Sequence, residues 1–156
     1  MEKNIKDNSV SATIRVLTDS EAEAALHLAW DVFCEYEAPE YGPEGTEEFR
    51  KTLNDRSYLA ALRYYGAFDG TRLIGVLAYM ESDTHICFFF VDSEYQRKGV
   101  GRTLFNRLAE EHPGKTVTLN SAPYGLPFYR RLGFTETAEE QTVNGIRFTS
   151  MEYSPK

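Results

Sequence analysis

The hydrophobic and polar positions along the chain change period several times, and each change predicts an element of secondary structure. A short strand is predicted over residues 13–17. Apolar residues then recur at helical spacing after Ser20, which forms a capping-box match with Glu23. This pattern predicts a helix that ends at about Glu37, because Pro39 and the glycine and proline after it break the chain. A second short helix is predicted over residues 46–54.

Between residues 63 and 91 the period shortens to two, which is typical of strands. Residues 63–68 and 73–80 flank Asp69-Gly70, a dipeptide typical of a hairpin turn, and residues 85–91 form the next hydrophobic run. The run from Phe88 to Phe90 is apolar on both faces, as expected of a central strand that is covered on both sides. Three consecutive antiparallel strands are therefore predicted.

A strand, a glycine-containing loop and a helix follow one another around residues 91–107. The hydrophobic run ends at Val91, Gly99 and Gly101 lie in the loop, and helical periodicity then begins. The first N–H groups of a helix lack intrahelical partners, and glycine lets a ligand approach them closely. The cations around the loop are Arg97, Lys98 and Arg102. The segment predicts a phosphate or pyrophosphate site, and the alternative is an ordinary strand-to-helix turn.

The last third of the chain predicts further strands and one short helix. Residues 115–120 have a strand pattern, Pro127 suits the first turn of a helix over 128–132, and Gly133 ends that helix. Residues 134–143 and 146–153 flank Asn144-Gly145, a strong signal for a type I′ hairpin. The order of elements predicts an α+β fold with a mixed, mostly antiparallel central sheet of about six to seven strands and helices on both faces.

Length, charge and cysteine spacing narrow the class of protein. The 156 residues suit one domain over 12–156 after a flexible tail over 1–11. The net charge of −7 disfavours binding to nucleic acid or to an anionic membrane, and the longest apolar run is too short to span a bilayer. Cys34 and Cys87 have no metal or redox spacing, and the three histidines lie in different elements, so no metal site is predicted. Free thiols and the absence of a signal-peptide pattern predict the cytoplasm.

Two segments resemble the GNAT superfamily of N-acetyltransferases. Residues 96–101 read Gln-Arg-Lys-Gly-Val-Gly and match the family's acyl-CoA loop, Gln/Arg-x-x-Gly-x-Gly/Ala. Residues 120–134 resemble its Asn…(Phe/Leu)-Tyr-x-x-x-Gly-Phe signature, and the resemblance covers residues 12–153. It implies acetyl-CoA as co-substrate, with pantetheine between two diverging strands. The cofactor-binding residues that it implies are Phe89, Phe90, Val91, Gln96, Arg97, Lys98, Gly99, Val100, Gly101, Arg102 and Asn120.

The resemblance also implies a role for Tyr129, which matches the tyrosine that protonates the departing CoA thiolate in many family members. A neutral phenol with a pKa of about 10 can donate its proton to a thiolate whose pKa is about 8.5. The alternative is that Tyr129 only packs against Phe128. The expected reaction is direct attack of a primary amine, from a small molecule or peptide, on the thioester in a ternary complex.

The general base is less clearly marked. His85 stands six residues before Val91, where histone acetyltransferases of the superfamily have a glutamate, and its imidazole titrates in a useful range. Alternation with period two predicts that His85 and Val91 share a face of the strand. Asp83, Glu81 and a chain of water molecules are the other candidates.

The sequence leaves alternatives open for the chemistry of the acceptor, for the class of function and for the oligomeric state. Residues 31–55 contain eight acidic residues, which suit a cationic amine or form an ordinary solvated helix face. A non-catalytic acyl-CoA-binding regulatory or interaction module is the alternative to an enzyme, although the intact Tyr129 favours the enzyme. Homodimers are common in the family, so the resemblance leaves a homodimer open.

Overall fold

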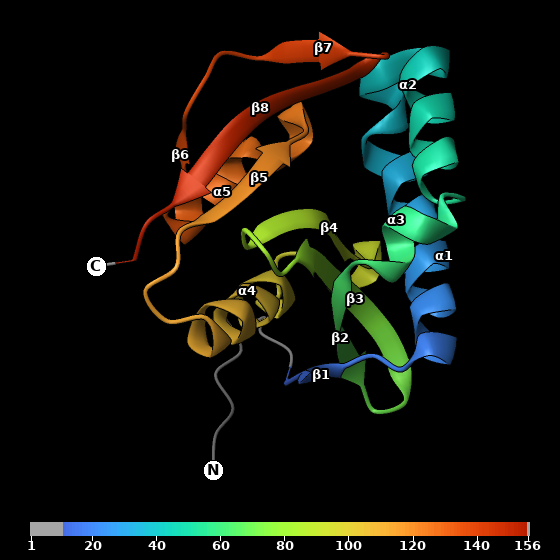
Figure 1. Cartoon of the computed structure of the whole chain (residues 1–156). Coiled ribbons are helices and arrows are strands. Elements are labelled where there is room, and N and C mark those ends of the chain that lie inside the picture. The colour runs from blue at the N-terminus through green and yellow to red at the C-terminus, as the bar shows by residue number, and fades with distance from the viewer. Residues whose placement is uncertain (1–10, 156) are drawn as a thin grey trace.

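A single central sheet runs through the computed structural model, which describes residues 11–155, and helices cover both of its faces (Figure 1). In chain order the elements are β1 (Thr13–Val16), α1 (Asp19–Tyr36), α2 (Ala38–Thr52), α3 (Arg56–Ala60), β2 (Arg63–Asp69), β3 (Arg72–Met80), β4 (His85–Val91), the 3₁₀ helix η1 (Ser93–Tyr95), α4 (Val100–Glu111), β5 (Val117–Ser121), the 3₁₀ helix η2 (Pro123–Gly125), α5 (Leu126–Leu132), β6 (Thr135–Glu136), β7 (Gln141–Val143) and β8 (Ile146–Tyr153). No helix in this described part is long and apolar enough to cross a membrane.

The sheet is mixed and mostly antiparallel, which confirms the predicted fold class. Its order is β1-β2-β3-β4-β5-β8-β6, and β7 pairs with β8. β4 and β5 are parallel, and the other paired neighbours are antiparallel. The sheet has eight strands rather than six to seven, because the predicted strand over 134–143 is interrupted between Glu136 and Gln141. Residues 1–10 of the predicted flexible tail lie outside the described residues.

The first four strands are sandwiched between α1 and α4, and each face has its own hydrophobic core. On the α1 face Ala29 and Phe33 are fully buried against Val76 and Phe88. On the α4 face Leu104 and Leu108 are buried with residues such as Ile74 and Leu77. Burial of apolar side chains on both faces fixes β3 and β4 as the centre of the molecule, as the run at 88–90 predicts.

The first helix ends as predicted, because α1 stops at Tyr36 with Glu37 as its C-cap, whereas its start and the following helices differ from the prediction. The capping box at the start of α1 consists of Thr18 and Glu21 rather than Ser20 and Glu23.

Pro39 lies in the first turn of α2, where its missing N–H leaves no helical hydrogen bond unmade. The predicted break at Gly42 and Pro43 is a kink inside α2, because Gly42 has a non-helical φ of 76°. The predicted helix over 46–54 is the part of α2 after this kink. Helix α3, which precedes β2, was not predicted at all.

A β-bulge in β4 changes which face each residue of that strand presents. The register with β3 shifts at this point, so Cys87 has no partner there. Ile86 before it packs in the α4 core, whereas Phe88 after it packs in the α1 core. The extra residue inverts the alternation, so the prediction that His85 and Val91 share a face is wrong.

The second half of the sheet diverges from the first immediately beyond the bulge. β4 and β5 pair only at His85 with Thr118 and at Ile86 with Leu119, after which the two strands separate. Helix α5 and strands β6 to β8 belong to the separated half, and the tip of the β7–β8 hairpin reaches back to α2 (Figure 1). The backbones of Gly45 and Gly145 meet there so closely that a Cβ on either residue would overlap the other.

Candidate active site

The divergence of β4 and β5 opens a cleft of about 960 Å³ in the middle of the molecule. Residues 87–91 of β4 form one wall, and Asn120, η2 and α5 form the opposite wall. Helices α1 and α2 and the β7–β8 hairpin enclose the remaining side. Beyond Ile86 one edge of β4 pairs with β3 and the other faces the cleft without a strand partner. This edge leaves main-chain groups available to an extended ligand.

The glycine loop lies at one end of this cleft. Gly99 is the N-cap of α4 and has a left-handed φ of 88°, and Arg97 has a left-handed φ of 62°. No side chain caps the helix, so its first N–H groups remain available at the cleft. Gly101 is required for a second reason, because a Cβ at this position would lie 2.7 Å from Cζ of Phe128. The glycine therefore allows α4 to pack closely against α5.

Gln96 holds the loop in place through both ends of its side-chain amide. Its Nε2 donates a hydrogen bond to the carbonyl of Val91 at 2.9 Å. Its Oε1 accepts one from the hydroxyl of Tyr124 at 2.7 Å. The ring of Tyr124 stacks on Tyr36 of α1 at 4.6 Å, and its N–H donates to Glu40 of α2. Gln96 thus links the loop to β4 and, through Tyr124, to the helices across the cleft.

Most of the predicted cofactor-binding residues line the cleft together. Those that do are Phe89, Phe90, Val91, Gln96, Arg97, Gly99, Gly101, Arg102 and Asn120. Lys98 and Val100 do not, and Val100 is buried in the α4 core. Asn120 also accepts a hydrogen bond from Ser150 of β8 at 2.9 Å, which fixes its side chain. Arg131 of α5, which the sequence did not mark, adds another cation to the lining, and Arg102 donates to its carbonyl at 3.2 Å.

Tyr129 lies on the wall opposite β4, with its ring among aromatic side chains. Phe89 and Phe134 are 5.9 and 5.7 Å away between ring centroids. Burial raises the pKa of Tyr129 well above its usual value, and the negative charge of Glu37 raises it further. The phenol is therefore fully protonated at neutral pH, which is the state that a proton donor to a thiolate needs.

His85 lies where β4 and β5 are still paired, and it is not among the residues that line the cleft. Its Nδ1 is 2.7 Å from the hydroxyl oxygen of Thr118, and burial lowers the pKa of the imidazole. Asp83 and Glu81 are not part of the cleft lining either. The structure thus separates the predicted base from Tyr129, and a catalytic role for His85 stays a prediction.

Tyr124 of the cleft was not predicted from the sequence, and Glu37 was predicted only as one of the eight acidic residues of segment 31–55. Glu37 is the C-cap of α1 and the N-cap of α2, so the junction of the two helices directs it into the cleft. The positions of both residues in the cleft depend on packing between distant segments, and a local sequence pattern does not mark such positions. The acidic rim predicted over 31–55 is mostly outside the cleft, whose lining includes only Glu37 and Glu48 from that segment.

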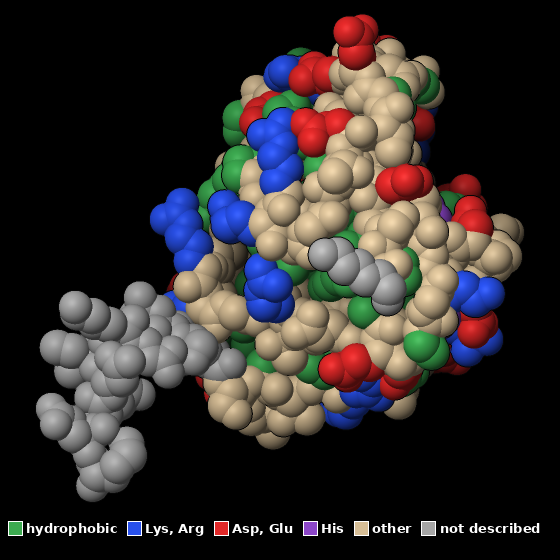
Figure 2. Space-filling view, turned by 90° about the vertical axis from the view of Figure 1, so that its left-hand side faces the viewer, with side chains coloured by type: hydrophobic (Ala, Val, Ile, Leu, Met, Phe, Trp, Pro, Cys, Tyr) green, Lys and Arg blue, Asp and Glu red, His purple; other side chains and the backbone are tan. Residues whose placement is uncertain are grey.

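The rest of the described surface has no second grouping of the predicted site residues. A hollow of about 300 Å³ at the end of α4 contains none of the predicted site residues. Among residues 11–155, no three His, Cys, Asp or Glu side chains are grouped so that they could hold a metal ion. On the face that holds the C-terminal half, acidic and basic side chains are interspersed and hydrophobic ones lie in small separate patches (Figure 2).

Comparison with known proteins agrees with this geometry. A family model described as an acetyltransferase (GNAT) domain matches residues 37–155, most of the chain. The chain belongs to the GNAT family of acetyltransferases, and this membership supports acyl transfer from coenzyme A. No curated protein matches the sequence.

Solved structures share the fold. A GCN5-related N-acetyltransferase from Rhodopseudomonas palustris is 19% identical, with 94% of this chain and 98% of that chain covered and a TM-score of 0.80. The PaiA N-acetyltransferase from Thermoplasma acidophilum, solved in complex with coenzyme A, is 20% identical, with 94% and 100% covered and a TM-score of 0.75. At these identities the likeness shows the fold alone.

Proposed function

We propose that the protein is an N-acetyltransferase that moves an acetyl group from acetyl-CoA to a primary amine in a ternary complex. The observation that carries this proposal is the arrangement around the cleft. The glycine loop lies at one end, the open edge of β4 runs along one wall, and the protonated Tyr129 faces that edge from the other wall. One continuous cleft thus has room for a donor and an acceptor at the same time.

The residues present fit acetyl-CoA, which would supply the acetyl group as an activated thioester. The free N–H groups at the start of α4, together with Arg97 and Arg102, suit the pyrophosphate. The unpaired edge of β4 at Phe89 and Val91 suits the amide groups of pantetheine. In this proposal an N–H of that edge near Val91 stabilises the charge that develops on the carbonyl oxygen.

In this mechanism the neutral amine attacks the thioester carbonyl, a C–N bond forms and the C–S bond breaks. Tyr129 donates its proton to the departing thiolate. The aromatic rings around Tyr129 hold the phenol in place and restrict water, which would otherwise compete with the amine.

Release of free thiol from acetyl-CoA in the presence of a panel of amines tests the proposal, with mass spectrometry of the acetylated product. We expect thiol release that depends on the acceptor and a product that is heavier by one acetyl group. The matched control omits the acceptor. Calorimetry that shows acetyl-CoA binding, combined with no thiol release for any amine or peptide, would support the non-catalytic binding module instead.

A further inference from the structure

The acceptor side of the cleft is walled by aromatic rings. Tyr41, Phe49 and Tyr58 are partly exposed there, and the rings of Phe33, Phe88 and Phe90 are buried directly behind them. Phe33 and Phe49 stack with ring centroids 4.1 Å apart, and the rings of Phe88 and Phe90 meet Phe49 edge to face at 6.0 and 5.8 Å. Such a wall binds an aromatic or alkyl group by excluding water, and it offers few partners to a body rich in hydroxyl groups.

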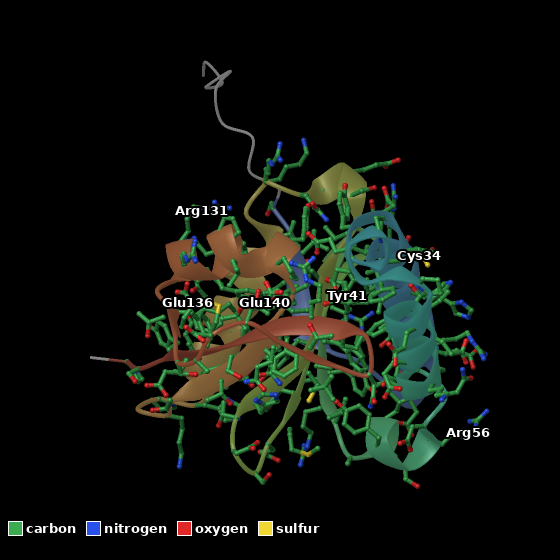
Figure 3. The ribbon with its side chains drawn as sticks, turned by 90° about the horizontal axis from the view of Figure 1, so that it is seen from above. Cys34, Tyr41, Arg56, Arg131, Glu136 and Glu140 are labelled. Carbon is green, nitrogen blue, oxygen red and sulfur yellow. The ribbon has the colours of Figure 1, made fainter. Side chains whose placement is uncertain are left out.

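Glu37 stands at the boundary between this aromatic wall and Tyr129. It is half-buried, and its charge acts on Tyr129 across the cleft. In Figure 3 the neighbouring Tyr41 lies between α2 and the β7–β8 hairpin, whereas Cys34 lies on the outer side of α1. Glu37 is therefore one of two acidic residues from residues 31–55 that an amine inside the cleft can meet, the other being Glu48.

The surroundings of Glu37 suit proton transfer near neutral pH. The pKa of its carboxyl is raised to about 7, chiefly by burial and then by the charge of Glu40, while hydrogen bonding to Tyr41 acts in the opposite direction. The ionisable groups that face Glu37 are Glu40 and Tyr41 on α2, Tyr124 on η2 and Tyr129 on α5, with Arg147 of β8 beside Tyr41. A carboxylate in such a site accepts a proton more readily than one in water.

We propose that Glu37 deprotonates the acceptor, and that the acceptor is a primary amine with an aromatic or alkyl body. This inference rests on the proposed function and adds the base and the substrate class. The ammonium form binds with its charge against the carboxylate and its apolar body against the rings. One proton passes from nitrogen to Glu37, and the neutral amine then attacks the thioester.

The same site accounts for the other protons of the reaction. Tyr129 gives its proton to the thiolate, and it regains one from the protonated Glu37. The second nitrogen proton leaves to solvent once the C–N bond has formed. The sum is one ammonium and one thioester consumed, and one amide, one thiol and one proton produced.

The test measures kcat/KM against pH for 2-phenylethylamine with acetyl-CoA, in the wild type, Glu37→Gln and Glu23→Gln. The wild type should show a limb that rises through about pH 7. In Glu37→Gln that limb should be lost, and activity should instead rise towards the pKa of the amine itself, about 10, because only the free amine then reacts. At pH 7 we expect a loss on the order of 10²- to 10⁴-fold. Glu23 is exposed on α1 away from the cleft, so Glu23→Gln should retain the wild-type profile.

The pH profile of His85→Ala, a comparison of acceptors and thermal melting distinguish the ways in which the proposal can fail. Retention of the limb in Glu37→Gln, or its loss in His85→Ala, would overturn the role of Glu37 while the acetyltransferase assignment stands. A preference for glucosamine over 2-phenylethylamine would overturn the acceptor class. Absence of thiol release in the wild type with every acceptor would instead remove the proposed function. Thermal melting of each variant shows whether it is folded.

Discussion

The two halves of the sheet are built differently, and the candidate site lies where they part. The half that contains β1 to β4 is built on β2, β3 and β4, strands of seven to nine residues with a hydrophobic core on each face. The half that contains β5 to β8 has one long strand, β8, with three short strands, and β6 and β7 are exposed. The first half supplies the glycine loop and the open strand edge, and the second supplies Tyr129 and Asn120. In the proposed mechanism the first half of the sheet therefore binds acetyl-CoA, and the second half supplies the proton donor.

Replacement of Tyr129 by Phe has the largest expected effect, because it removes the contribution of the second half to the chemistry. The ring packing against Phe89 and Phe134 is preserved, and only the proton donor is lost. We expect kcat to fall on the order of 10²- to 10⁴-fold, with acetyl-CoA affinity unchanged by calorimetry. A variant that retains most of its turnover, under conditions where chemistry limits the rate, would assign Tyr129 to packing.

Removal of the cations at the loop tests the contribution of the first half. The double variant Arg97→Ala, Arg102→Ala should weaken acetyl-CoA binding on the order of 10- to 100-fold, because charge-assisted contacts to phosphate are lost. Isothermal calorimetry at two salt concentrations is the measurement, and the salt dependence should also decrease. Arg130→Ala is the matched control, since Arg130 pairs with Glu136 and does not line the cleft. Equal affinities for both variants would place the phosphates elsewhere.

The smallest expected effect concerns Glu37, at the junction of α1 and α2. Its titration should change the free energy of unfolding with pH. Its pKa is raised to about 7 in the folded protein, so the native state holds a proton that the unfolded chain releases near pH 4.5. Stability therefore falls as pH rises from about 4.5 to about 7 and then levels off. Glu37→Gln should remove this loss, about 1–2 kcal/mol after allowance for partial exposure.

Urea unfolding of the wild type and Glu37→Gln at pH 5 and pH 8 is the measurement. We expect the variant to gain stability relative to the wild type at pH 8 and not at pH 5. A constant difference between the two proteins at both pH values would mean that Glu37 titrates near its usual pKa.

Local patterns predict the parts of this molecule that are locally determined. The loop around Gly99 and the turn at Asn144-Gly145 were visible because only certain residues tolerate those backbone angles. The bulge at Cys87 was not visible, because nothing in the residues of β4 marks where the register with β3 shifts. The positions of Glu37 and Tyr124 in the cleft were missed since they depend on how α1, α2 and η2 pack together. Sequence pattern thus indicated the residues at the glycine-loop end of the cleft well and those that α1, α2 and η2 contribute to it poorly.

The meeting of Gly45 and Gly145 has a consequence for how the cleft is enclosed. At this point helix α2 and the β7–β8 hairpin touch backbone to backbone, so neither position has room for a side chain. One added methyl group at either glycine would push the hairpin away from the helix. Both α2 and the hairpin contribute residues to the lining of the cleft, so two glycines outside that lining hold its two edges together.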